Sequence, residues 1–213
     1  ADGAGGEGFD NAAETLFISP IHAEKYLEAA KNALEYGMGD PRARSRFIVD
    51  PSDKLTPDQA ARKTLDAFLP RAYRRTIAVG ETDRPMRLFA AARQRGESYD
   101  NAILLALQSV LISPQFLFRI ERPAPSHDMR PIDSHAMASR LSYWLWGSMP
   151  DDELLNLAAM DKLRDPAVLD AQIVRLLKSE KSREFAESFV EQWLGTRELG
   201  RDIKPDKTLF PAY

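Results

Sequence analysis

Hydrophobic residues recur at intervals of three and four along most of the chain, and no stretch alternates convincingly with the two-residue period of a strand. After Ser19, for example, Ala23, Leu27, Ala30 and Leu34 are spaced for one face of a helix. This pattern predicts an all-α fold, an irregular bundle of about eight helices with little or no β-structure.

Helix start signals recur as a Ser, Thr or Asp followed directly by Pro. The side-chain oxygen accepts a free backbone N–H, and proline fits the first helical position. Such pairs begin at Ser19, Thr56, Ser113 and Asp165. Helix stops are predicted at Gly37, Gly96, Gly147 and Gly195, and Pro70 either ends or kinks its helix. The predicted helices span about 19–37, 57–69, 82–95, 99–112, 133–146, 151–159, 166–178 and 181–194, with a short segment at 114–121.

Composition shifts along the chain suggest a domain organisation. We expect a flexible N-terminal segment over 1–18, where glycine is frequent, and a first helical domain over 19–121 with a loop at 37–55. A Pro-rich linker over 122–132 then leads to a second helical domain over 133–213. Because the last ten residues are punctuated by proline and no closing element follows, we expect this domain to be truncated and the chain to be a fragment.

Charge and composition exclude several classes of function for this chain. It has 213 residues and no cysteine, so it holds no disulfide, thiolate metal site, cysteine nucleophile or covalently attached haem. The net charge of −3 argues against nucleic acid as a partner. The longest apolar run, 102–112, is much shorter than the roughly 20 residues of a membrane span. Since no basic segment followed by an apolar one opens the chain, we expect no signal peptide in it.

The charge is unevenly distributed. Residues 37–95 contain 13 Lys or Arg against 7 Asp or Glu, whereas the remainder carries a net charge of −9. The arginines of this region either form a patch for phosphate, sulfate or an acidic partner domain, or pair with the acidic remainder of the same molecule.

No catalytic constellation emerges. His22, His127 and His135 lack the spacing of a zinc site, and we interpret them as surface residues. The Asp151-Asp152-Glu153 triplet either holds a hard cation or, as we favour, caps the helix that begins there. We therefore assign no catalytic residue, no metal ligand and no cofactor site.

The densest aromatic cluster comprises Tyr143, Trp144 and Trp146, with Arg140 one turn before. At 100° per residue these rings cannot share one stripe of a helix. Either the helix is buried on several faces, which we favour, or one ring projects towards a ligand or partner. Candidate contact residues are Arg140, Tyr143, Trp144, Trp146, Arg74 and Arg75.

Several motifs together resemble three consecutive planctomycete-specific domains of unknown function. Residues 9–20 and 26–30 look like the end of the first, and residues 61–75 and 107–119 (LQSVLISPQFLFR) look like the second. Residues 138–154 (ASRLSYWLWGSMPDDEL) are similar to the opening of the third. The chain departs from the pattern at Thr76, where the family usually has proline, and at Pro70.

The resemblance implies a part of a large extracytoplasmic or periplasmic bacterial protein, in which a c-type cytochrome domain and sometimes a carbohydrate-binding module accompany such domains. It implies no catalytic residue, and any haem c would lie in the parent protein outside this chain. We therefore expect a helical scaffold or interaction module whose partners are neighbouring domains or a redox partner. The alternative is a polysaccharide-binding or polysaccharide-processing unit.

Overall fold

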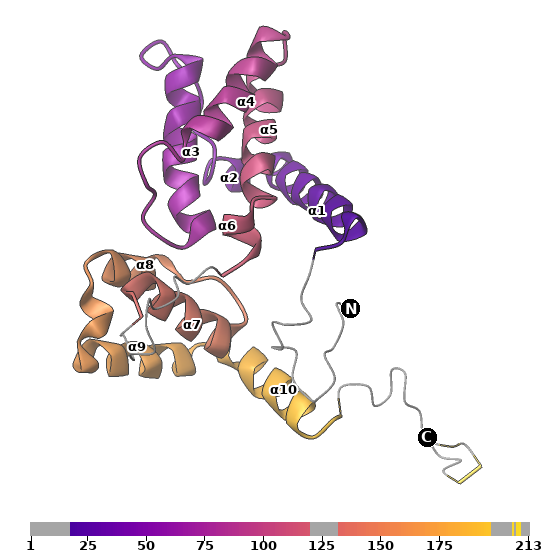
Figure 1. Cartoon of the computed structure of the whole chain (residues 1–213), viewed down its shortest axis with the longest axis vertical. Coiled ribbons are helices and arrows are strands. Elements are labelled where there is room, and N and C mark those ends of the chain that lie inside the picture. The colour runs from indigo at the N-terminus through magenta and orange to yellow at the C-terminus, as the bar shows by residue number, and fades with distance from the viewer. Residues whose placement is uncertain (1–17, 120–131, 197–205, 207, 210–213) are drawn as a thin grey trace.

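The computed structural model describes residues 18–119, 132–196, 206 and 208–209. Throughout these residues the secondary structure is helical, apart from one isolated bridge between Ser52 and Leu55, and this part of the chain contains no strand (Figure 1). The predicted all-α fold is confirmed. His127, nearly all of the predicted linker and residues 1–17 lie outside the described residues.

The first group of helices follows the predicted pattern with additions. It consists of α1 (Pro20–Gly39), α2 (Pro41–Arg44), α3 (Pro57–Tyr73), α4 (Asp83–Gln94), α5 (Tyr99–Leu111) and α6 (Pro114–Leu117). The short α2 lies inside the predicted loop at 37–55, and it begins with Asp40 accepting a hydrogen bond from the N–H of Arg42. The capping rule that predicted the other helices therefore also applies here.

The second group comprises α7 (Ser134–Trp146), α8 (Asp152–Ala159), the 3₁₀ turn η2 (Lys162–Arg164), α9 (Pro166–Lys178) and α10 (Ser182–Trp193). Their start signals act as expected. Asp133, Asp151 and Asp165 each accept a hydrogen bond from a free N–H in the first turn of the helix that follows. Gly147 ends α7 with a positive φ of 61°, a conformation that glycine adopts at little cost.

The predicted ends of α1 and α3 are wrong, and α6 begins at Pro114 as predicted but ends at Leu117 and lacks the predicted side-chain cap. Gly37 does not stop α1, which continues to Gly39. A Cβ at position 37 would lie 3.1 Å from the Phe47 ring, so Gly37 allows this ring to approach the helix closely. Pro70 lies in the last turn of α3, and its carbonyl accepts the N–H groups of Arg74 and Arg75 that close the helix. Ser113 does not cap α6, because its hydroxyl donates to the carbonyl of Val110 and contacts the Tyr73 hydroxyl.

Two hydrophobic cores form, one on each side of residues 120–131. The first lies among α1, α3, α4 and α5 and contains the fully buried Leu65, Phe89 and Leu107. The second lies among α7, α8, η2 and α9 and contains Leu154, Leu163 and Leu176. α5 packs against α1, α3, α4 and α6, as expected for a helix that is apolar on most sides.

Truncation of a leucine in α5 tests this arrangement. Leu107→Ala should lower the free energy of unfolding by about 2–5 kcal/mol, because it removes a fully buried side chain and leaves a cavity. Leu27→Ala on α1 makes the same chemical change at a side chain that is 45% exposed, and should cost less than about 1 kcal/mol. Urea denaturation followed by circular dichroism measures both, and equal losses would contradict a core centred on α5.

Candidate functional site

Arg74 lies directly after α3 and adopts the left-handed conformation, with φ 56°. Its side chain is buried, and the guanidinium donates to four backbone carbonyls at 3.0–3.1 Å. These belong to Ala72, Gln115, Phe116 and Phe118. The C-terminal carbonyls of a helix carry partial negative charge. Arg74 therefore joins the ends of α3 and α6 as an internal cation, which we call the Arg74 clamp.

Tyr143 of α7 lies against the same junction. The guanidinium carbons of Arg74 and Arg119 lie 5.8 and 5.1 Å from its ring centroid, within the range of cation–π attraction. Since α7 belongs to the second core, this aromatic ring brings the two cores into contact.

Two further contacts cross between the cores. Arg71 of α3 pairs with Asp152 of α8, with Nη1 3.0 Å from Oδ1. Nε2 of His135 on α7 lies 3.5 Å from the Thr76 hydroxyl, and burial lowers the pKa of this half-buried histidine. His135 is thus less solvated than predicted.

Arg75 forms a two-pronged ion pair with Glu81, at 2.6 and 2.7 Å. The hydrogen bonds from Arg75 lower the pKa of Glu81, and the N–H of Ala78 also donates to this carboxylate. The guanidinium lies over the Tyr73 ring as well. Arg75 therefore holds the turn between α3 and α4.

Glu81→Gln should lower stability at pH 7 by up to about 1 kcal/mol, since it removes the negative partner of Arg75. The pKa of Glu81 is lower in the folded chain than its ordinary 4.5, so its contribution is present above about pH 4.5 and is lost as the pH falls through the folded-state pKa. The variant and the parent should therefore converge in acid. Urea titrations from pH 7 to pH 3 measure this, with the exposed Glu28→Gln as control.

Trp146 is buried beneath α9. Its indole Nε1 donates to the carbonyl of Leu176 at 2.9 Å, and Arg175 and Lys181 lie over the ring at 5.6 and 4.8 Å from its centroid. This side chain is only 6% exposed. Trp146 thus fills the second core, in agreement with the core interpretation of the aromatic cluster.

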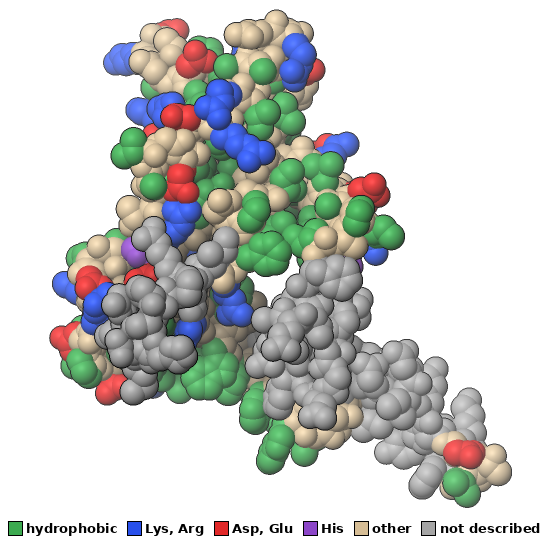
Figure 2. All heavy atoms as spheres, viewed as in Figure 1, with side chains coloured by type: hydrophobic (Ala, Val, Ile, Leu, Met, Phe, Trp, Pro, Cys, Tyr) green, Lys and Arg blue, Asp and Glu red, His purple; other side chains and the backbone are tan. Residues whose placement is uncertain are grey.

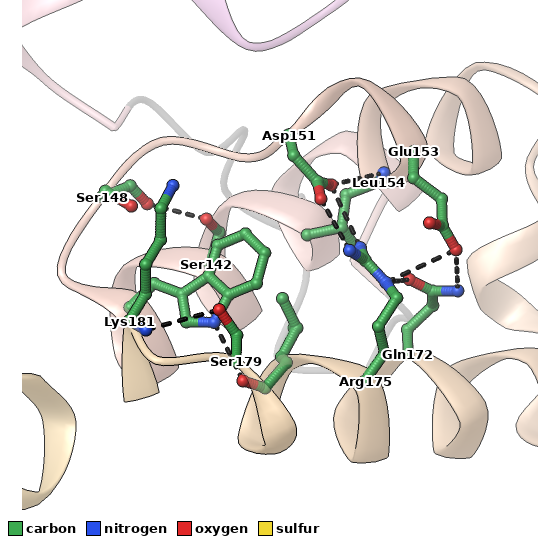
Figure 3. A network of polar contacts seen from close by, with 11 residues as sticks. Ser142, Ser148, Asp151, Glu153, Leu154, Gln172, Arg175, Ser179 and Lys181 are labelled. Atoms are coloured by element: carbon green, nitrogen blue, oxygen red, sulfur yellow. Dashed lines mark hydrogen bonds and ion pairs between the residues drawn. The ribbon is translucent and has the colours of Figure 1, made fainter. Parts of the chain in front are cut away.

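The acidic triplet supports the same region. Asp151 caps α8 through the N–H of Leu154 and pairs with Arg175, which also lies 3.4 Å from Glu153 (Figure 3). Burial alone would raise the pKa of Asp151, but the hydrogen bonds from Arg175 and Leu154 outweigh it and the pKa is lowered. The capping interpretation is confirmed at Asp151, and no group of three possible metal ligands occurs within the described ranges.

The basic region is partly neutralised within the molecule. Arg44 pairs with Asp50 and Asp100, and Arg71 pairs with Asp152. Asp100 and Asp152 belong to the acidic remainder, so internal pairing is confirmed for these arginines.

Trp144 differs from its neighbours, because 65% of its surface is exposed. It contacts Phe185 of α10 edge to face at 5.8 Å between ring centroids, and two further rings continue the series. Phe185 lies 5.8 Å from Phe189, which stacks on Trp193 at 6.1 Å. We call these four residues the aromatic ridge. Arg140, the remaining candidate, is exposed on α7.

The ridge shows what the sequence predictions missed. Phe185, Phe189 and Trp193 were not among the candidate contact residues, although their spacing of four along one helix was visible. That spacing indicates a stripe, but it does not indicate whether another element covers it.

Three family models match the chain in succession. They are each described as a protein of unknown function, DUF1587 over residues 1–37, DUF1595 over 60–121 and DUF1592 over 132–213. The three matches follow one another along the chain. The resemblance to unknown-function domains is thereby confirmed, and the candidate residues divide between the DUF1595 and DUF1592 matches.

No curated protein and no solved structure matches the chain. Among the helices that the structure describes, none has the length and apolar character needed to cross a bilayer.

The two tryptophans of α7 provide a matched pair of substitutions. Trp146→Phe should lower the free energy of unfolding by about 1–3 kcal/mol, because it removes the indole donor, leaves the Leu176 carbonyl with only the N–H of Ser179, and opens space in the core. Trp144→Phe keeps an exposed ring against Phe185 and should change stability by less than about 0.5 kcal/mol. Urea denaturation measures both, and a larger loss for Trp144→Phe would contradict these placements.

Proposed function

We propose that this chain is a helical scaffold and interaction module that performs no catalysis on its own. The Arg74 clamp is the observation that carries the proposal. Two helical cores, which we propose as domains over 19–121 and 133–213 with a linker over 122–132, meet at Arg74, Tyr143 and Arg119. Such a junction suits a module that holds neighbouring domains in fixed positions.

Arginine is well suited to this junction. Its planar guanidinium is always charged and offers five donors in a fixed geometry, so it can satisfy several carbonyls at once. Here it ties together the ends of two helices while its face lies near the rings of Phe116 and Tyr143. A lysine has fewer directional donors, and methionine has none.

The proposed setting is a multidomain extracytoplasmic bacterial protein in which a c-type cytochrome domain accompanies these domains. Its support is the resemblance to planctomycete domains of unknown function, together with the three tandem matches. The proposed partners are therefore neighbouring domains of the same polypeptide or a redox partner. Haem c would be attached in the parent protein, because covalent attachment needs the cysteines that this chain does not contain.

A polysaccharide-binding or polysaccharide-processing unit is the second candidate. The observation that favours it is the exposed Trp144, with Arg140 also exposed on the same helix. Titration with neutral and sulfated glycans, followed by tryptophan fluorescence in the parent and in Trp144→Ala, tests this candidate. A saturable shift in the parent that disappears in the variant would support it.

The clamp can be tested by measuring a distance between the two cores. The chain has no native cysteine, so Lys63→Cys on α3 and Lys178→Cys on α9, both at exposed positions, permit specific spin labelling. Pulsed electron spin resonance should give a narrow distance distribution in the parent. Arg74→Met should broaden it and lower stability by about 2–4 kcal/mol, because buried carbonyls lose their donor.

Two further variants make this result interpretable. Arg42→Met removes an exposed arginine for which the described part of the structure shows no side-chain partner, and it should leave the distribution unchanged. Arg74→Lys retains the charge and should give an intermediate width if Arg74→Met fails to fold. An unchanged distribution in a folded Arg74 variant would overturn the proposed junction.

A further inference from the structure

On α10, polar side chains face the rest of the molecule and apolar side chains are exposed, which is the reverse of an ordinary amphipathic helix. Ser188 and Gln192 are half-buried and hydrogen-bond to each other. Phe189, Val190 and Trp193 are 43%, 43% and 67% exposed. A helix on a globular protein normally turns its apolar stripe towards the core, so the orientation of α10 leaves an apolar face open.

This face is continuous and straight. At 1.5 Å per residue, the stretch from Phe185 to Leu194 is about 14 Å long, and Leu194 at its end is 59% exposed. α10 extends away from α7 (Figure 1), and hydrophobic side chains follow its edge (Figure 2). We call Val190, Trp193 and Leu194 the open face, which adjoins Phe189 and the rest of the aromatic ridge.

We propose that the open face binds an amphipathic partner helix whose apolar stripe is flanked by Lys or Arg side chains. This inference rests on the proposed role as an interaction module and names the chemistry of its partner. A straight row of side chains at helical spacing packs into the grooves of a second helix, which presents its own residues at intervals of three and four.

Charge complementarity supports basic flanks. At 100° per residue, Glu187 and Glu191 lie beside the open face, on the side next to Leu194. Glu187 pairs with Arg183 on the surface, and Glu191 has no side-chain partner among the described residues. α10 as a whole contains three glutamates against one arginine. Lys or Arg beside the partner's stripe would meet these carboxylates.

Two other occupants fit the geometry less well. A sugar ring stacks on an exposed aromatic face, but Phe189 and Trp193 stack on each other with an interplanar angle of 28°, so each covers part of the other's face. A second copy paired antiparallel about Phe189 would place Glu187 of one chain beside Glu191 of the other, and like charges across a contact are unfavourable.

The test uses this chain and three synthetic 18-residue peptides. One is an amphipathic helix with leucines at positions i, i+3, i+4 and i+7 flanked by lysines. The second carries the same leucines flanked by glutamates, and the third is a scrambled form of the first. Isothermal titration calorimetry should show micromolar binding of the lysine-flanked helix, at least tenfold weaker binding of the other two, and weakening with added salt.

Surface variants locate the binding. Val190→Ser and Trp193→Ser should each weaken the lysine-flanked peptide at least tenfold, whereas Val174→Ser, at a position on α9 that is 49% exposed, should leave its affinity unchanged. Because all three side chains are exposed, circular dichroism should confirm that the variants remain folded. Equal affinity for the scrambled peptide, no binding of the lysine-flanked one, or unchanged affinity in both α10 variants would overturn the proposal.

Two remaining outcomes point to other occupants. Self-association of the parent in sedimentation that is lost in Trp193→Ser would replace the partner helix with a second copy. Saturable binding of a neutral glycan lost in the same variant would replace it with a polysaccharide. The spin-label distance across the Arg74 clamp does not depend on α10. If the peptide does not bind but the spin-label distance distribution stays narrow, this inference is rejected and the proposed scaffold role is not affected.

Discussion

Burial of the Arg74 guanidinium is the constraint on which the arrangement of the helices depends. A charge taken out of water must be compensated by polar partners, and the described structure supplies these as four backbone carbonyls near the ends of α3 and α6. For these carbonyls to surround the guanidinium, α3 must end just after Pro70 and α6 must lie beside the end of α3. Tyr143 then meets the same cation from α7, so one residue sets the relation among three helices.

Much of the fold could be predicted because helix ends depend on local chemistry. Asp133 and Gly147 bound α7, and the Asp165-Pro166 pair begins α9, using contacts within a few residues. The same rule applied to Asp40-Pro41 would have found α2. Gly37 was misread because a glycine that ends a helix and one that admits a neighbouring ring are identical in sequence, and the ring belongs to Phe47, ten positions later.

The candidate site was less predictable, because its contacts are distant along the chain. The Arg74 clamp joins residues more than forty positions apart, and backbone acceptors leave no pattern in the side chains. For the tryptophans, the sequence showed that Trp144 and Trp146 must face different ways, but not which one is covered. The orientation of α10 was hidden for the same reason, since periodicity defines a stripe and not its neighbour.

The three tryptophans of the chain occupy two kinds of surroundings, which gives the protein a built-in optical reporter. Trp146 lies in the core beneath two cations, and Trp144 and Trp193 lie at the two ends of the aromatic ridge in contact with water. A soluble quencher such as acrylamide should extinguish the emission of the latter pair and spare the former. Occupation of the open face and loosening of the second core would therefore alter different fractions of one spectrum, without any added dye.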